Sequence, residues 1–320
     1  MPMTIPARSL IASTILFSAM VLHAQDADMW TAQGDSLLVA GKQKQAADAF
    51  TKALQLSPNH IKALEGRSQA WFETEKLDKF MLDAEKLLRL DTANHRGHLL
   101  RATYSLYGED FSLSEHHATR AADHAPDDHS RARALLIRGQ ARAAFKRQGP
   151  AIEDLEAGLA LIPDDTRAMS TLARMYDAAS RHAEALALLE KLCEMEPDEL
   201  GHWSNRGFEL VMLGRYQEAM PVIEKALAKD KDEPVALSNR AYVHLMLGRE
   251  KEAAQDVERS LRSMPANPYA LRTRALIRLR KGDRAQACED LTLAKVLGDI
   301  AEVDQLVREH CATTPLPESR

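Results

Sequence analysis

The sequence has few aromatic residues, only three cysteines and none of the motifs of common enzyme families. Aromatic side chains make up 5% of its 320 residues, a small share for a β-sandwich, in which such residues and valine are enriched. The sequence contains no glycine-rich phosphate loop and no Gly-x-Ser-x-Gly elbow, so we expect no catalysis. Charges of both signs are interspersed and sum to −5. Without a basic stripe, nucleic acid is not an expected partner.

The amino terminus has the composition of a signal peptide. Arg8 precedes an apolar segment over residues 10–22, and Ala24 offers a small residue for cleavage. About 13 apolar residues fall short of the roughly 20 that span a bilayer. We therefore expect a signal peptide over residues 1–24 and no membrane span after its cleavage. No cysteine precedes Cys193, which excludes lipidation at the new terminus and leaves a periplasmic or secreted protein.

Two passages of the sequence repeat one another. Ser204-Asn205-Arg206 recurs 34 residues later as Ser238-Asn239-Arg240, and a fixed period of this size indicates a repeat solenoid. Carried in both directions, the period divides most of the chain into eight units, with one slip of three residues at 129–131. The predicted units are 27–60, 61–94, 95–128, 132–165, 166–199, 200–233, 234–267 and 268–298.

Each unit has the pattern of two helices joined by a turn. Apolar and small residues recur at three- and four-residue steps, as one buried helix face requires. Gly41, Gly214, Gly248 and Gly282 share position 15 of their units, where glycine can end the first helix in the left-handed conformation. A last amphipathic helix over residues 299–311 is predicted to cap the final unit, and residues 312–320 are a loose tail.

The first unit carries a family resemblance. Trp30, Gly34, Ala46, Phe50 and Pro58 stand at positions 4, 8, 20, 24 and 32 of that unit, and this pattern resembles the tetratricopeptide repeat. The resemblance implies an all-α, right-handed superhelical solenoid. It also implies a non-catalytic interaction scaffold of the exported bacterial type, which binds a polypeptide or complex partner in the cell envelope.

In that family the first helices line the concave face, so their positions 2, 5, 6, 9, 12 and 13 are candidate groove positions. In the carboxy-terminal half the candidate groove residues are Arg174, Asn205, Phe208, Asn239, Tyr242, Arg272 and Leu276. Amides can bond to the backbone of an extended peptide, and arginines can bind carboxylates. The alternative for Asn205 and Asn239 is solvation or hydrogen bonding at a helix terminus.

Arginine and aspartate recur at two positions on facing helices. The arginines at position 7 are Arg67, Arg101, Arg138, Arg206, Arg240 and Arg274. The aspartates at position 23 are Asp83, Asp154, Asp256 and Asp290. We expect ion pairs between these helices, within a unit or to the next, rather than ligand binding.

Cysteine and histidine offer the remaining chemistry. Cys288 and Cys311 flank the turn near Gly298 and are expected to form a disulfide outside the cytoplasm. Cys193 is expected to be a buried thiol.

Six histidines gather in the third unit and its exit, namely His95, His98, His116, His117, His124 and His129. Convergence of three of them on a metal lacks a supporting motif, so we assign no metal or cofactor. A metal- or pH-responsive regulator acting through this unit is the alternative function.

Overall fold

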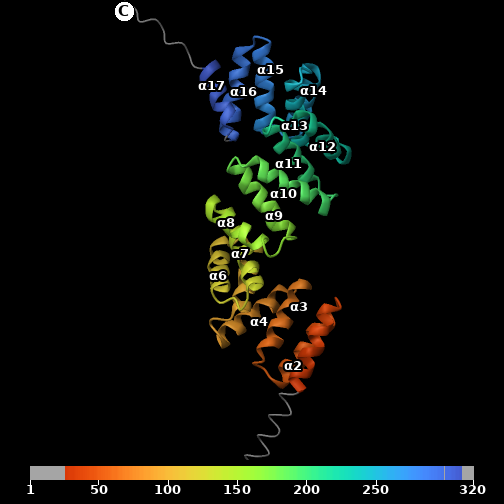
Figure 1. Cartoon of the computed structure of the whole chain (residues 1–320), viewed down its shortest axis with the longest axis vertical. Coiled ribbons are helices and arrows are strands. Elements are labelled where there is room, and N and C mark those ends of the chain that lie inside the picture. Colours follow the sequence, from red (N-terminus) through yellow and green to blue (C-terminus); the bar gives the residue numbers. More distant parts are fainter. Residues whose placement is uncertain (1–25, 299, 312–320) are drawn as a thin grey trace, which may run out of the picture. The chain divides into compact units, whose positions relative to one another are not determined.

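The computed structural model describes residues 26–298 and 300–311, and the regular structure within these ranges is helical (Figure 1). They belong to two compact parts, residues 1–168 and 169–320, and the boundary lies within α9 (Thr166–Ala178). From here on these two parts are called the first unit and the second unit, and the 34-residue hairpins are called repeats. None of the described helices is long and apolar enough to cross a membrane. The helices of the first unit are residues 26–39, α2 (Gln43–Leu56), α3 (Ile61–Glu73), α4 (Leu77–Leu90), α5 (His95–Tyr107), α6 (Phe111–Asp123), α7 (Asp128–Ala144) and α8 (Gln148–Leu159). The helices of the second unit after α9 are α10 (His182–Met195), α11 (Leu200–Met212), α12 (Tyr216–Lys229), α13 (Pro234–Met246), α14 (Glu250–Ser263), α15 (Pro268–Arg280), α16 (Arg284–Leu297) and α17 (Ala301–His310).

Neighbouring helices pack as a stack of hairpins. The first helix of a hairpin packs on the second, as α7 does on α8 and α13 on α14, and it also packs on the first helix of the next hairpin, as α13 does on α15. Each unit is therefore an all-α repeat solenoid, as predicted.

The turn between the two helices is built alike in all eight hairpins. Gly41, Gly214, Gly248 and Gly282 have φ between 69° and 82°, which confirms the left-handed conformation predicted for position 15. The same position in the other four repeats also has positive φ, from 56° to 59°, although its residue is not glycine. These four residues are Glu75, Glu109, Lys146 and Ser180. The backbone geometry is thus retained where the sequence signal is lost.

The slip of three residues lengthens a helix instead of forming a loop. Asp127 precedes α7 and accepts a hydrogen bond from the Ser130 amide at 2.7 Å. The helix consequently starts at Asp128 and has 17 residues, whereas α5 and α9 have 13. Three residues are close to one helical turn, so the repeats on both sides of the insertion keep the same register.

Small residues allow the paired helices to approach closely. A Cβ on Gly207 would lie 2.6 Å from Cγ1 of Ile223, so the partner helix fills the space where a side chain would stand. In the second repeat the bulky Phe80 stands where alanine is usual. It is fully buried and contacts the rings of Phe72 and Tyr104, at centroid distances of 5.3 and 6.0 Å.

The recurring arginines form ion pairs between helices, as expected. Four of them pair with the aspartate of the same repeat, and two pair with a glutamate of the preceding repeat. Arg67, Arg138, Arg240 and Arg274 each bond through Nε and Nη2 to both carboxylate oxygens of the aspartate 16 residues later, at 2.7–3.0 Å. Arg101 and Arg206 belong to repeats that have an arginine at position 7 but no aspartate at position 23, and they bond backward to Glu85 and Glu190 of the preceding repeat, each at 3.2 Å. The aspartates are at most 7% exposed in their side chains, so these pairs join the helices and do not face a ligand.

The last helix covers the end of the second unit's core. Ile300, Val303 and Leu306 are at most 9% exposed and belong to the same cluster as Leu271 and Leu291 of the last hairpin. The predicted signal peptide (1–24) and tail (312–320) lie outside the described residues.

Candidate functional site

The residues expected to line a groove in the second unit fall into two groups. Arg174 and Asn205 are exposed, and Phe208, Tyr242 and Leu276 are partly buried. Phe208 contacts Tyr269 edge to face at a centroid distance of 5.1 Å, and Leu276 packs against the apolar cluster of the last hairpins. Part of the expected surface is therefore already covered by the chain's own side chains.

Two of the groove predictions are corrected by burial. Asn239 is 3% exposed, and its Nδ2 donates to the backbone oxygen of Ser204 at 3.3 Å. Arg272 is 4% exposed; its guanidinium stacks on Tyr242 at 4.1 Å and pairs with Glu302 of α17 at 3.1 Å. Both side chains are used within the protein, because the neighbouring first helix and the capping helix supply their partners.

The first unit has an open cavity at the positions that the family resemblance assigns to a groove. Its volume is about 380 Å³, and α5, α7 and the start of α9 supply most of its walls. We name it the first-unit groove and define it by Thr103, Tyr107, Arg133, Leu136, Gln140 and Arg167. Thr103 and Gln140 occupy position 9, and Arg133 and Arg167 occupy position 2, of their repeats. The cavity therefore lies at repeat positions that the resemblance assigns to a groove, but in a part of the chain for which no residues were proposed.

Two arginines and a tyrosine stand among the polar and aliphatic side chains that line this groove. Arg133 and Arg167 are exposed, and the guanidinium of Arg167 lies 4.7 Å from the centroid of the Tyr107 ring. Arg96, at position 2 of the preceding repeat, donates to Oε1 of Gln69 at 2.7 Å. Burial and the positive charge of Arg133 lower the pKa of Arg96. Arginines of successive repeats are thus close enough to repel one another, and an anion between them would relieve that repulsion.

A second cavity shares Tyr107 with the first-unit groove. It has a volume of about 630 Å³, and its lining combines Phe72, Leu77 and Tyr104 with two acidic residues, Glu73 and Glu75. Leu77 and Tyr107 are 44% and 55% exposed. An elongated surface therefore joins an apolar part to a cationic part through one exposed tyrosine.

The sequence did contain a signal for this surface. Position 2 is basic in four successive repeats, as Lys62, Arg96, Arg133 and Arg167. The signal is easily overlooked, because the residues are 34 or 37 apart and ordinary surfaces are rich in arginine and lysine.

The histidines of the third repeat pair with each other instead of converging in threes. Nδ1 of His98 lies 2.9 Å from Nδ1 of His117, and Nδ1 of His95 bonds instead to the backbone oxygen of Ala121. Burial, with a smaller effect of His98, lowers the pKa of His117 to about 4. Within the described residues of this repeat, no three metal-ligating side chains meet.

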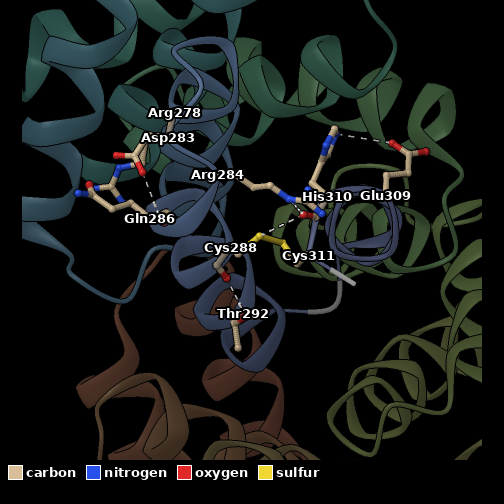
Figure 2. Close-up of a disulfide and its surroundings, with 9 residues drawn as sticks. All are labelled: Arg278, Asp283, Arg284, Gln286, Cys288, Thr292, Glu309, His310 and Cys311. Atoms are coloured by element: carbon tan, nitrogen blue, oxygen red, sulfur yellow. Dashed lines mark hydrogen bonds and ion pairs between the residues drawn. A yellow bond between two sulfur atoms is a disulfide. The ribbon is translucent and has the colours of Figure 1, made fainter. Parts of the chain in front are cut away.

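The two cysteines at the carboxyl end are bonded to each other in the structure. Their Cα atoms lie 5.6 Å apart, and the bond links α16 to the end of α17 (Figure 2). Arg284 reaches across the same junction and donates to the backbone oxygen of His310. Cys193 is buried, and burial raises the pKa of its thiol to about 11, so the reactive thiolate is scarce at neutral pH.

Comparisons with known proteins agree with the hairpin architecture. Models of the tetratricopeptide repeat match residues 22–95 and 210–277, and a comparison with curated proteins finds no match. Among solved structures, the chain is similar to PilW, a type IV pilus biogenesis factor. The identity is 19%, with 64% of this chain and 93% of that one covered, and the TM-score is 0.54. It is also similar to YrrB, described as a tetratricopeptide repeat protein with an unusual peptide-binding site. Here the identity is 17%, the coverage is 61% and 98%, and the TM-score is 0.51. At these identities the likeness shows the fold.

Proposed function

Because this chain is a tetratricopeptide repeat protein, we propose that it is a non-catalytic scaffold that binds an acidic, extended segment of a polypeptide in the first-unit groove. The observation that carries the proposal is the pair Arg133 and Arg167, which line one cavity from successive repeats. An extended peptide presents carboxylates at intervals, and guanidinium groups bind carboxylates through two parallel hydrogen bonds. The peptide-binding site of the fold neighbour YrrB supports this class of ligand.

The composition of the groove supports an extended segment rather than a small anion. The partly buried Ile137 and the half-exposed Tyr107 line the same cavity as the arginines, so side chains between the acidic residues of a ligand would also find contacts. Asp165 lines the same cavity, but its carboxylate accepts a hydrogen bond from the Ala168 amide at 2.8 Å as the cap of α9. The negative charge in the groove is thus already engaged in the fold.

The proposed compartment is the cell envelope. The positive charge, short apolar segment and small residue of positions 1–24 support export. The test is expression in a bacterium, separation of the periplasm from the cytoplasm, and mass spectrometry of the protein. We expect a chain that starts near Gln25 in the periplasm; a full-length chain in the cytoplasm would contradict export.

Binding is tested with peptides of defined charge. We would measure fluorescence anisotropy with ten-residue Gly/Ser peptides that carry four glutamates, and with peptides that carry glutamines at the same places. The glutamate peptides should bind and the glutamine peptides should not. Charged hydrogen bonds contribute about 1.5–3 kcal/mol each, so the double variant Arg133→Glu/Arg167→Glu should weaken binding at least about tenfold.

Arg131 provides a matched control, since it is an exposed arginine of the same helix that does not line the groove. Arg131→Glu makes the same chemical change and should leave the affinity within about twofold, because distant surface charges are screened. If Arg131→Glu and Arg133→Glu weaken binding equally, or if both kinds of peptide bind alike, the proposed groove is wrong.

A further inference from the structure

Three metal-ligating side chains meet in the second unit. Asp177 comes from the end of α9, His182 begins α10, and Glu209 lies in the last turn of α11. Nδ1 of His182 is 2.8 Å from Oε2 of Glu209 and 3.6 Å from Oδ1 of Asp177. The three ligand atoms all lie within 4.8 Å of one another.

The trio is partly shielded from water and opens on one side. The side chain of Glu209 is 3% exposed, that of His182 is 16% exposed, and that of Asp177 is 40% exposed. Glu209 thus forms the floor of the site and Asp177 its rim.

The charges of the trio are not balanced. Burial, with the negative charge of Asp177, raises the pKa of Glu209 to about 8, and burial also raises the pKa of Asp177 against the opposing effect of His182. Among the described residues, no lysine or arginine contributes to either shift. Tyr269 of α15 also faces the two carboxylates: burial, Asp177 and Glu209 raise its pKa, and Arg272, whose guanidinium lies 5.5 Å from the centroid of the Tyr269 ring, opposes this effect.

This arrangement differs from the rest of the chain, where buried carboxylates face arginines. Asp154, for example, bonds to both Arg138 and Arg142. Two carboxylates that share one imidazole, with no guanidinium between them, leave a deficit of positive charge. A divalent cation would remove the repulsion and make use of all three ligand atoms.

We infer that Asp177, His182 and Glu209 form a binding site for a divalent transition metal, with Zn²⁺ as the ion that this ligand set fits best. One imidazole nitrogen and two carboxylate oxygens match the ligands that Zn²⁺ takes in proteins, with a fourth position left for water. Mg²⁺ and Ca²⁺ prefer six or more oxygen ligands, which this site does not supply.

The geometry requires only a small adjustment. Ligands about 2.1 Å from a tetrahedral Zn²⁺ stand about 3.4 Å apart. The 3.6 Å between His182 and Asp177 already fits, and the 2.8 Å hydrogen bond between His182 and Glu209 has to open. That hydrogen bond is replaced when both side chains turn their ligand atoms to the metal.

The test uses the full-length protein after removal of metals with a chelator. Isothermal titration with ZnCl₂ at pH 7.5 should show one site, and titration with MgCl₂ should show none. His182→Ala and Glu209→Gln should each weaken binding at least about tenfold.

Glu209→Gln keeps the size of the side chain and removes its charge, so it tests the ligand without leaving a cavity. His202→Ala is the matched control, because His202 also bonds to a glutamate, Glu196, at 2.8 Å, but among the described residues this pair is not part of a group of three metal-ligating side chains. It should bind Zn²⁺ like the wild type. Absence of zinc binding overturns the inference, and so does binding that is kept in Glu209→Gln or lost in His202→Ala.

Discussion

Two asparagines at the same repeat position should respond differently to the same substitution. Asn239 is 3% exposed and donates through Nδ2 to the Ser204 oxygen at 3.3 Å, whereas Asn205 is exposed. Asn239→Asp turns the donor into an oxygen that faces another oxygen. The lost hydrogen bond costs about 1–2 kcal/mol. Keeping the buried carboxyl neutral at pH 7 adds roughly 2 kcal/mol, because each unit of raised pKa corresponds to about 1.4 kcal/mol.

We therefore expect Asn239→Asp to lower the free energy of unfolding by about 3–4 kcal/mol at pH 7, and Asn205→Asp to change it by less than about 0.5 kcal/mol. Urea unfolding followed by circular dichroism measures both. The raised pKa of the new carboxyl makes its cost largest above the ordinary aspartate pKa, so the cost should shrink as the pH falls from 7 to 4.5. Equal losses in the two variants, or no loss at Asn239, would refute the assignment of Asn239 to the interior.

Three other properties can be measured in the same way. Lys146→Gly should raise the free energy of unfolding by about 1 kcal/mol, because glycine adopts the φ of 56° without strain, and Gly248→Ala should lower it by a similar amount in urea unfolding. Cys311→Ser should cost about 3 kcal/mol for a disulfide that spans 23 residues, and calorimetry of the wild type with reductant should reproduce the loss. Since the pKa of His117 is lowered to about 4, the unfolded chain binds more protons than the folded one between about pH 4 and 6.5. Stability should therefore fall by about 2 kcal/mol across this range on acidification, less so in His117→Gln, with the His117 pKa followed by NMR.

Local and periodic features of the fold were predictable from the sequence. A spacing of 34 residues is repeated often enough to define the repeats, and the four glycines at position 15 indicated the left-handed turn. The ion pairs followed as well, since residues 16 apart on facing helices have fixed positions within every hairpin. The partners of Arg101 and Arg206 were not predictable in this way. Without an aspartate at position 23 of their own repeat, they pair with a glutamate of the preceding repeat, and the sequence did not decide between a partner in the same repeat and one in a neighbouring repeat.

The sites depend on contacts that a repeat pattern does not specify. Asn205 and Asn239 share a position and flanking residues, and they differ only in what packs against them. The Asp177–His182–Glu209 group draws on three helices at separations that match no metal-binding motif. The first-unit groove was predictable in principle from the basic residues at position 2, but a cavity forms only where the facing side chains leave space between them.

The capping helix supplies charge as well as apolar cover. Glu302 lies 34 residues after Pro268, so α17 takes the place in the sequence that the first helix of a ninth repeat would have. From there Glu302 reaches Arg272 at 3.1 Å and accepts a hydrogen bond from the hydroxyl of Tyr242 at 3.4 Å. A guanidinium that is only 4% exposed would cost several kcal/mol without a counter-charge. The carboxylate of Glu302 therefore occupies the place that the sequence analysis assigned to a ligand. Arg272 has the residue type and the repeat position of a groove residue, but it is not available for binding.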